Sequence, residues 1–221
     1  MSTLPAAADT PDSPGSVPRG LFVAFEGGDG AGKSTQAKLL AAALEASGRT
    51  VLLTREPGGT PIGEKLRSLV LEHGQGEIDA RTEALIFAAA RAAHAARVIR
   101  PALAAGTTVI TDRYVDSSVA YQGAGRELGE DRVRELNEWA TAGLHPDVTV
   151  LLDVAPQEAR ERRADNAPDR LESEPDRFHH RIRQAFLTLA QARPEHYLVL
   201  NARLDVATLH ASVLARVGEL P

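Results

Sequence analysis

Cysteine is absent from this chain of 221 residues, and basic residues do not outnumber acidic ones. Without cysteine the protein forms no disulfide, no thiolate metal site and no cysteine nucleophile. This fits a reducing compartment, so we expect a cytoplasmic protein. The 25 Lys and Arg against 30 Asp and Glu give a formal net charge of −5 at pH 7. Because nucleic-acid clamps and membrane-surface proteins normally carry a basic excess, we expect neither a nucleic-acid nor a membrane partner.

Long apolar runs are also missing, because no stretch reaches the roughly 20 residues that a membrane-spanning helix needs. The first nineteen residues, MSTLPAAADTPDSPGSVPR, show neither a helical nor a strand period, and they lack the basic start and apolar stretch of a signal peptide. We therefore expect a disordered tail over 1–19. The 43% hydrophobic content of the chain suits one sizeable core, so a single domain is expected over 20–221.

Short β-type runs alternate with longer helical patterns from residue 20 onward. The expected strands are LFVAFE at 21–26, TVLLTRE at 50–56, TTVITDR at 107–113, VTVLLDV at 148–154 and YLVLN at 197–201. Helical patterns cover 32–47, 61–73, 80–105, 127–142, 156–163, 175–192 and 206–217. This alternation predicts an α/β fold with a parallel sheet that helices cover on both faces. Ligands gather at the carboxyl ends of the strands in such sheets.

A glycine-rich segment, GGDGAGKST, joins the first expected strand to the first expected helix. It fits the P-loop pattern G-x-x-x-x-G-K-S in the strand-to-helix context where that pattern binds phosphates. Its glycines let backbone N–H groups converge on an anion, Lys33 can reach the β- and γ-phosphates, and the Ser34 hydroxyl can ligate Mg²⁺. The pattern therefore predicts a nucleoside triphosphate site with Mg²⁺, formed by Gly27, Gly28, Asp29, Gly30, Ala31, Gly32, Lys33, Ser34 and Thr35.

Three classes of protein use such a site: a GTPase-like switch, an ATPase motor or binding module, and a kinase that passes the γ-phosphoryl group to a small acceptor. The guanine-reading tetrapeptide Asn-Lys-x-Asp of GTPases occurs nowhere in the chain. Motors usually carry larger domains and partner surfaces. A kinase needs a second anion site.

Two further motifs place arginines at the ligand edge of the expected sheet. TREPGGT follows the second strand and contains Arg55, and ITDRYVDSSVAYQGAGR follows the third and contains Arg113. Either arginine alone is more typical of a surface ion pair, but together with the P-loop they outline a second anion pocket opposite Lys33. Asp112 is the candidate carboxylate that holds Mg²⁺ through water, and Asp153, at the end of the fourth strand, is its rival.

Several motifs in one order make the chain resemble the bacterial thymidylate kinases, which phosphorylate dTMP to dTDP. The order is FEGGDGAGKST, TREPGGT, EKLRSLVLE, ITDRYVDSSVAYQ and LLDV, and the resemblance extends from residue 20 to the C-terminus. It implies the fold of P-loop nucleoside monophosphate kinases, with a five-stranded parallel sheet in the order 2-3-1-4-5. It also implies ATP as donor, dTMP as acceptor, Mg²⁺ as cofactor, and a homodimer for which Ala-rich helix faces could serve. Another nucleotide or deoxynucleoside kinase, or a P-loop switch, stays the alternative.

The resemblance implies a thymine pocket around the long helix DARTEALIFAAARAAHAAR. Phe87 and Arg91 are four residues apart, so a ring and a guanidinium project from one face and can stack on and hydrogen-bond a flat base. From the residue pattern alone, Phe87 would be a core residue. By resemblance, Ser118 and Gln122 line the base pocket, and Tyr121 crowds the 2′ position of the sugar.

The resemblance also implies contacts to the sugar and phosphate of dTMP. Asp29 is expected to approach the sugar 3′-hydroxyl and the metal region. Arg55, Arg67 and Arg113 are expected to bind the acceptor phosphate. Because a monophosphate is mostly ionised near pH 7, no general base is required.

The P-loop contains no arginine, since its four variable positions read Gly-Asp-Gly-Ala. Phosphoryl transfer depends on alignment and on positive charge around the transferring group, so that charge must come from elsewhere. The segment RERRADNAPDRLE, residues 160–172, resembles the basic, Arg-rich lid of the bacterial subgroup that lacks a P-loop arginine. Arg160 is expected to be exposed or salt-bridged, and a solvated, charged helix end is the alternative interpretation. The expected catalytic set combines sheet-edge and lid residues: Lys33, Asp112, Arg113, Arg162, Arg163 and Arg170.

Overall fold

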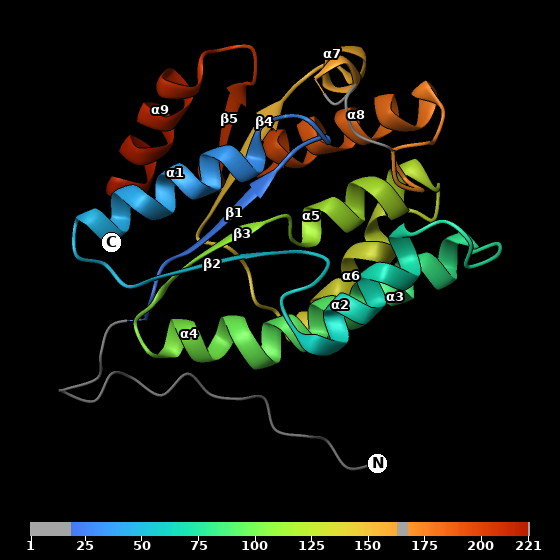
Figure 1. Ribbon diagram of the computed structural model, residues 1–221, viewed down its shortest axis with the longest axis horizontal. Helices are drawn as coiled ribbons and strands as arrows, with labels where there is room; N and C mark the ends of the chain where they lie inside the picture. Colours follow the sequence, from blue (N-terminus) through green and yellow to red (C-terminus); the bar gives the residue numbers. More distant parts are fainter. Residues whose placement is uncertain (1–18, 163–167, 221) are drawn as a thin grey trace.

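The computed structural model describes residues 19–162 and 168–220. In this part of the chain a parallel sheet carries helices on both faces (Figure 1). The strands are β1 Phe22–Glu26, β2 Val51–Arg55, β3 Thr108–Asp112, β4 Val148–Asp153 and β5 Tyr197–Asn201. Their spatial order is β2-β3-β1-β4-β5 and every pairing is parallel, which confirms the expected architecture. None of the helices in the described ranges is both long and apolar enough to cross a lipid bilayer.

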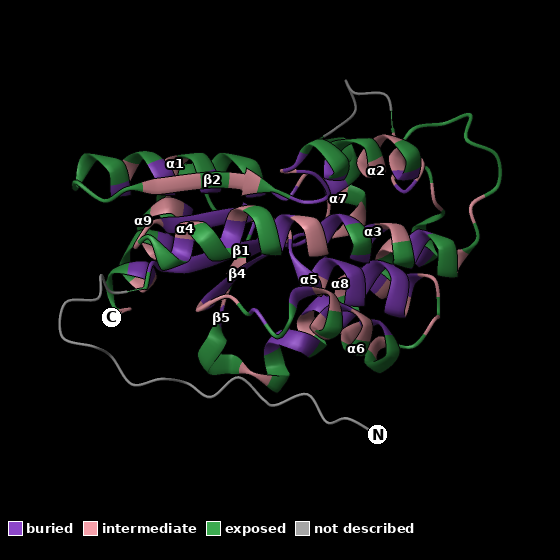
Figure 2. Ribbon diagram, turned by 90° about the horizontal axis from the view of Figure 1, so that it is seen from below, coloured by how far each residue is buried: buried purple, intermediate pink, exposed green. Residues whose placement is uncertain are grey.

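Alternating side chains along the strands divide the core into two layers. In β1, Phe22 and Ala24 pack on one side of the sheet, whereas Val23 and Phe25 pack on the other. The Val23 side is covered by α1 Lys33–Ala46, α7 Pro156–Glu161 and α9 Val206–Gly218. The Phe22 side is covered by α2 Pro61–Leu71, α3 Ala80–His94, α4 Arg100–Ala104, α5 Val115–Ser118 and α8 Asp176–Ala192, with α6 Glu130–Thr141 packed against α3. Figure 2 shows the buried β1 and β4 between these layers and exposed residues on the outer sides of the helices.

The long helical pattern expected over 80–105 is interrupted in the structure. A π-helical turn, Ala95–Ile99, separates α3 from α4, while the backbone stays helical through both junctions. Pro101 explains where this turn lies, because in a regular α-helix its ring would clash with the carbonyl group four residues earlier. The helix therefore continues through a wider turn rather than ending.

A further helical segment follows β3, where no helix was expected from the sequence. α5 runs into a second π-helical stretch, Val119–Gly125, so the motif DSSVAYQGAG is helical. Tyr121 and Gln122 follow Ser118 by three and four positions, and all three side chains line the same cavity. The glycines of the motif hid this helix, because glycine is a poor helix former.

Some helix N-termini are capped by a side chain and others are not. Thr60, Asp79 and Asp205 cap α2, α3 and α9 by accepting hydrogen bonds from first-turn N–H groups. α1 begins after Gly32, whose φ of +94° favours glycine, and no side chain caps it. The N-terminus of α1 therefore keeps its N–H groups and the positive end of its dipole for an anion.

Candidate active site

The P-loop connects β1 to α1 at the carboxyl edge of the sheet. Lys33 is buried, and its Nζ donates to the Gly28 carbonyl oxygen at 2.8 Å, so the side chain curls back over the loop. Gly27 has a φ of +130°, and a Cβ there would lie 2.4 Å from the Leu152 carbonyl oxygen. Only glycine allows this close approach to β4, which sets where the loop leaves the sheet.

Two oxygen ligands that suit Mg²⁺ meet beside the P-loop. Ser34 Oγ donates a short hydrogen bond to the Asp112 carboxylate, because β1 and β3 are neighbours that end at the same edge. The rival carboxylate is bound elsewhere, since Arg183 donates to Asp153 at 2.6 and 2.8 Å. Within the described residues no group of three or more His, Asp or Glu side chains could hold a metal on its own. A hydroxyl and a carboxylate beside a phosphate loop fit Mg²⁺, which keeps several waters and phosphate oxygens in its shell.

Arg113 follows β3 in a left-handed conformation, with a φ of +73°. This conformation is uncommon for a residue with a side chain and concentrates at functional sites. The guanidinium reaches the P-loop, where Nη2 lies 2.5 Å from Asp29 Oδ1. The Tyr121 hydroxyl donates to the other oxygen of Asp29 at 2.8 Å. Burial opposes ionisation, but the charges of Arg113 and Lys33 hold the pKa of Asp29 well below its usual range.

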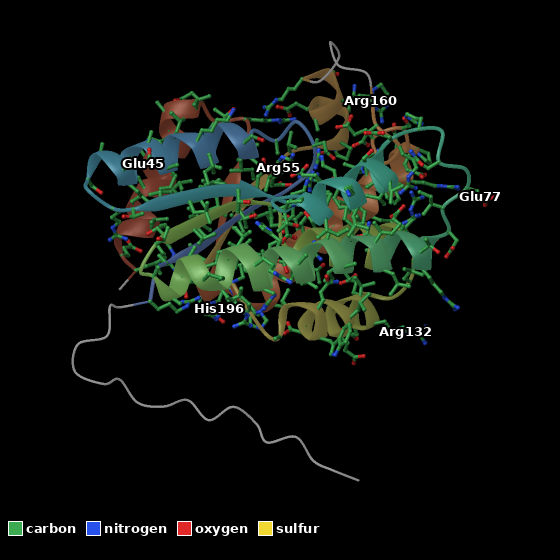
Figure 3. All side chains as sticks on the ribbon, turned by 60° about the horizontal axis from the view of Figure 1, so that its bottom comes forward. Glu45, Arg55, Glu77, Arg132, Arg160 and His196 are labelled. Atoms are coloured by element: carbon green, nitrogen blue, oxygen red, sulfur yellow. The ribbon has the colours of Figure 1, made fainter. Side chains whose placement is uncertain are left out.

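Two more arginines approach the same edge from β2 and α2. Arg55, labelled in Figure 3, and Arg67 both donate to the Pro57 carbonyl oxygen, at 2.8 and 3.1 Å. Arg55 also forms an ion pair with Glu64 at 2.9 Å. With Arg113, these side chains line the cavity that contains the P-loop lysine. The structure thus brings the three arginines expected at the acceptor phosphate to one place.

An adjoining cavity gathers the residues expected to contact the base and sugar. Apart from Arg55, every residue expected to contact dTMP lines it: Asp29, Arg67, Phe87, Arg91, Arg113, Ser118, Tyr121 and Gln122. Leu71 and Leu171 add apolar surface to the same cavity. Phe87 is only 8% exposed, so it is both a core residue and part of the cavity wall.

Arg91 is more constrained than its expected role suggests. Its Nε donates to Glu56 at 2.6 Å, and its Nη1 donates to Ser118 and Asn137. Its Nη2 donates to the Tyr114 carbonyl oxygen at 3.0 Å. These bonds use four of the five N–H groups of the guanidinium and leave one on Nη2. Arg91 can therefore offer a single, rigidly oriented donor to a base.

The first lid arginines lie near α7 and the end of β5. Arg160, labelled beside α7 in Figure 3, pairs with Asp176 at the start of α8 and is 56% exposed, which confirms the expectation for this residue. Arg162 Nη2 donates to the Ala202 carbonyl oxygen at 2.9 Å. Arg163 lies outside the described residues.

Arg170 contacts groups on α2 and α3. Its Nη2 lies 2.5 Å from Glu83 Oε2, and its Nε donates to the Val70 carbonyl oxygen at 2.8 Å. It lines neither the cavity around Lys33 nor the cavity around Phe87. The role expected for Arg170 at the transferring phosphoryl group stays a prediction, and in the structure its guanidinium holds the end of the lid segment against α2 and α3. The sequence could not show this, since its partner Glu83 is 87 positions away.

Two buried carboxylates that bind side chains of the site or its surroundings were missed in the sequence analysis. Glu56, within TREPGGT, binds both Arg91 and His94. Glu83 lies four positions before Phe87 and eight before Arg91, on the same buried face of α3. An acidic residue at helical spacing within an otherwise apolar face is a signal that could have identified Glu83. Nothing comparable marks Glu56, because its partners come from another element.

A P-loop that faces an arginine-lined pocket across the carboxyl edge of a parallel sheet is typical of kinases that act on nucleotides. The donor side comprises the loop and the N-terminus of α1. The acceptor side comprises the ends of β2 and β3 together with α3 and α5. Fold and site therefore define a P-loop phosphotransferase with adjoining donor and acceptor pockets.

Comparison with known proteins narrows this class. A family model described as thymidylate kinase matches residues 25–213. The thymidylate kinase of Cutibacterium acnes is 53% identical over 201 residues, which cover 91% of this chain and 98% of that protein. The one of Clavibacter sepedonicus is 52% identical over 203 residues, with coverages of 91% and 96%. The crystal structure of thymidylate kinase from Ehrlichia chaffeensis matches with a TM-score of 0.73 and 33% identity, covering 90% of this chain and 99% of that one.

The chain belongs to the thymidylate kinase family. Its activity is that of a dTMP kinase, which transfers the γ-phosphoryl group of ATP to dTMP and releases dTDP and ADP.

Proposed function

We propose how the residues of this chain carry out the transfer. The P-loop N–H groups and Lys33 bind the β- and γ-phosphates of ATP, and Mg²⁺ is held by Ser34 directly and by Asp112 through water. The hydrogen bond between Ser34 and Asp112 supports this proposal, because it shows that the two side chains meet beside the phosphate loop. When bound, Mg²⁺ neutralises charge on the β- and γ-phosphates.

The acceptor phosphate is bound by the arginines at the ends of β2 and β3. Arg55, Arg67 and Arg113 hold it in line with the γ-phosphoryl group, which converts the reaction into an intramolecular one. Asp29 stays ionised beside Arg113 and accepts a hydrogen bond from the sugar 3′-hydroxyl. The chain needs no general base, since the attacking phosphate oxygen carries no proton to remove.

The base is held in the cavity that adjoins this phosphate site. Phe87 stacks on the thymine ring, and the remaining Nη2 hydrogen of Arg91 is available to a carbonyl oxygen of the base. Ser118 and Gln122 face the edge of the base. Tyr121, fixed by its bond to Asp29, crowds the 2′ position and favours deoxyribose.

Positive charge around the γ-phosphoryl group comes from the lid. We assign this role to Arg162 and Arg163, because the P-loop has no arginine and Arg170 is bound to Glu83. Arg162, which is 34% exposed, forms an ion pair with Glu158, and the exposed Arg203 shares the same carboxylate. Such surface pairs are weak and can be exchanged for a phosphate.

Asp112→Asn tests the metal assignment. An amide orders the hydration shell of Mg²⁺ less strongly than a carboxylate, so we expect kcat to fall by about 100-fold and the Mg²⁺ requirement to rise. Asp153→Asn is the matched control, because it removes the carboxylate at the end of β4 and breaks only the pair with Arg183. ADP release with dTMP is measured at increasing Mg²⁺. Equal Mg²⁺ dependence in the two variants would contradict the assignment.

We also propose a homodimer that pairs the outer surfaces of α2 and α3. Ile62 and Leu69 on α2 and Leu85 on α3 are 52%, 46% and 56% exposed, and the two helices pack side by side. Large exposed apolar side chains on adjacent helices are typical of association surfaces. A cytoplasmic location is proposed from the absence of cysteine.

A further inference from the structure

A buried carboxylate lies directly behind the wall of the acceptor cavity. Glu83, in the first turn of α3, has no exposed surface and does not line the cavity. Gln122, which does line it, donates from Nε2 to Glu83 Oε1 at 2.9 Å. Arg126 and Arg170 form ion pairs with Glu83 Oε2 at 3.1 and 2.5 Å. Glu83 thus lies one hydrogen bond away from a residue placed to face the base.

The bond to Glu83 determines which end of the Gln122 amide is free. A carboxylate paired with two arginines only accepts hydrogen bonds, so it binds the NH₂ end of an amide and not the carbonyl end. The opposite orientation would set two oxygen atoms against each other inside the protein. The Gln122 carbonyl oxygen is therefore left for a ligand, and among the described residues no hydrogen bond to it is found.

We propose that Glu83 sets the base specificity of the acceptor pocket by holding the Gln122 carbonyl oxygen toward the base. This inference rests on the proposed placement of the base against Gln122. A carbonyl oxygen accepts a hydrogen bond from the N3–H of thymine or uracil. In cytosine the same ring position is itself an acceptor, so both atoms stay unsatisfied and binding is weakened. Selection against cytosine therefore depends on a residue that touches no substrate.

The same carboxylate also positions the end of the lid segment. Arg170 extends from Glu83 to the Val70 carbonyl oxygen, and its backbone N–H donates to the Leu71 carbonyl oxygen at 3.2 Å. Leu71 and Leu171 line the acceptor cavity. Glu83 is thus a positioning residue. It binds the Gln122 amide directly, and through Arg170 it holds the segment that contributes Leu171 to the cavity wall.

Glu83→Gln tests this inference. The substitution keeps the shape of the side chain but leaves one acceptor oxygen, for which two arginines and the Gln122 amide compete. Gln122 is then free to turn either end toward the base. We expect KM for dTMP to rise by about tenfold, and the ratio of kcat/KM for dTMP over dCMP to fall by about tenfold or more. KM for ATP and kcat with dTMP should change by less than about threefold.

Glu174→Gln is the matched control. Glu174 also accepts a hydrogen bond from Arg126, at 2.5 Å, but among the described residues no hydrogen bond joins it to Gln122, so we expect the wild-type ratio of kcat/KM for dTMP over dCMP. Thermal unfolding of both variants reports on folding. If the ratio of kcat/KM for dTMP over dCMP in Glu83→Gln equals that of the wild type, the inference is overturned at any level of activity. A purely structural role of Glu83 would lower kcat/KM for both acceptors by the same factor.

A second measurement needs no variant. Equilibrium binding of dUMP and dCMP to the wild-type protein compares two bases that differ in the N3 hydrogen and its neighbouring group but both lack the thymine methyl. Binding of dUMP at least about tenfold tighter than dCMP supports the inference, and equal binding overturns it. Phosphoryl transfer to dTMP is measured with the same preparation. Transfer to dTMP together with equal binding of dUMP and dCMP would overturn the base-specificity inference but not the kinase activity.

Discussion

Glu26, the last residue of β1, supports Arg113 from behind the P-loop. It is 1% exposed and accepts hydrogen bonds from the N–H groups of Tyr114 and Ser117, at 2.8 and 3.1 Å. Ser117 Oγ donates to Glu26 at 2.6 Å and accepts from Arg113 Nη1 at 2.9 Å. Burial and the charge of Asp116 raise the pKa of Glu26 to about 7. The charge state of this residue near neutral pH therefore affects the group that holds Arg113.

The raised pKa predicts a pH dependence of stability. In the unfolded chain Glu26 ionises near its ordinary pKa of 4.5 and in the folded protein near 7, so between these values the folded state holds the extra proton. The stability that Glu26 adds is complete below pH 4.5 and is lost as the pH rises to about 7. Glu26→Gln removes this titration, so the free energy of unfolding of the wild type relative to the variant should decline over that interval in urea titrations.

Asp205→Asn provides a control of opposite sign. Hydrogen bonds from the Thr208 side chain and backbone lower the pKa of Asp205 below its ordinary 3.8. The stability that Asp205 adds to the folded protein is therefore present above that pH and is lost on acidification. A difference between the wild type and Glu26→Gln that stays constant from pH 4.5 to about 7 would contradict the assignment to Glu26.

At the scale of an element, the P-loop and α1 depend on glycines for different reasons. Gly27, where the loop leaves β1, combines a φ of +130° with a Cβ position 2.4 Å from the Leu152 carbonyl oxygen. Gly48, just after the C-terminus of α1, has a φ of +88° but nothing within 4 Å of its Cβ position. The backbone conformation disfavours a side chain at both sites, and only Gly27 is also enclosed by rigid backbone.

Alanine at these two positions should therefore have unequal effects. Gly48→Ala should lower the free energy of unfolding by about 1 kcal/mol through backbone strain alone and leave kcat unchanged. Gly27→Ala should lower the free energy of unfolding by more than about 2 kcal/mol and greatly weaken ATP binding, because either the loop or β4 must shift. Thermal unfolding and ATP titration calorimetry measure the two effects. Equal losses of stability in the two variants would show that crowding of the Gly27 position against the Leu152 carbonyl oxygen does not affect the free energy of unfolding.

At the scale of the whole molecule, the proposed dimer surface and the acceptor cavity share the helices on one side of the sheet. α3 carries Phe87 and Arg91 toward the acceptor cavity, whereas Leu85 on the same helix is 56% exposed. A dimer that covers Leu85 would restrain the helix that holds the base. The structure thus connects the proposed oligomer to the acceptor pocket through one rigid element.

Leu85→Glu tests the proposed dimer surface. A charge at the centre of a buried apolar contact is costly, so this variant should sediment as a monomer at concentrations where the wild type is a dimer. Leu214→Glu on α9, at a position that is 37% exposed on the opposite side of the sheet, is the control and should leave the dimer intact. Sedimentation velocity distinguishes the two. A dimeric Leu85→Glu protein would remove α3 from the interface.

The sequence by itself determined the strands, most helices and the P-loop, because their signals lie within a few neighbouring residues. Alternating or continuous apolar runs define the strands, and glycine spacing between a strand and a helix defines the phosphate loop. The helix after β3 escaped this reasoning, because its glycines lower helix propensity while contacts with α6 and α8 stabilise it. The π-helical turn before Pro101 escaped it too, since the pattern of apolar residues continues through it.

Only the tertiary structure decided which charged groups belong together. Asp112 and Asp153 end similar apolar strands on either side of β1, and the side chains that reach them distinguish the two: Ser34 for one and Arg183 for the other. Arg170 likewise appeared beside other lid arginines in the sequence, yet its partner is Glu83. Charge pairs inside a protein depend on contacts between residues far apart in the chain, which no local pattern records.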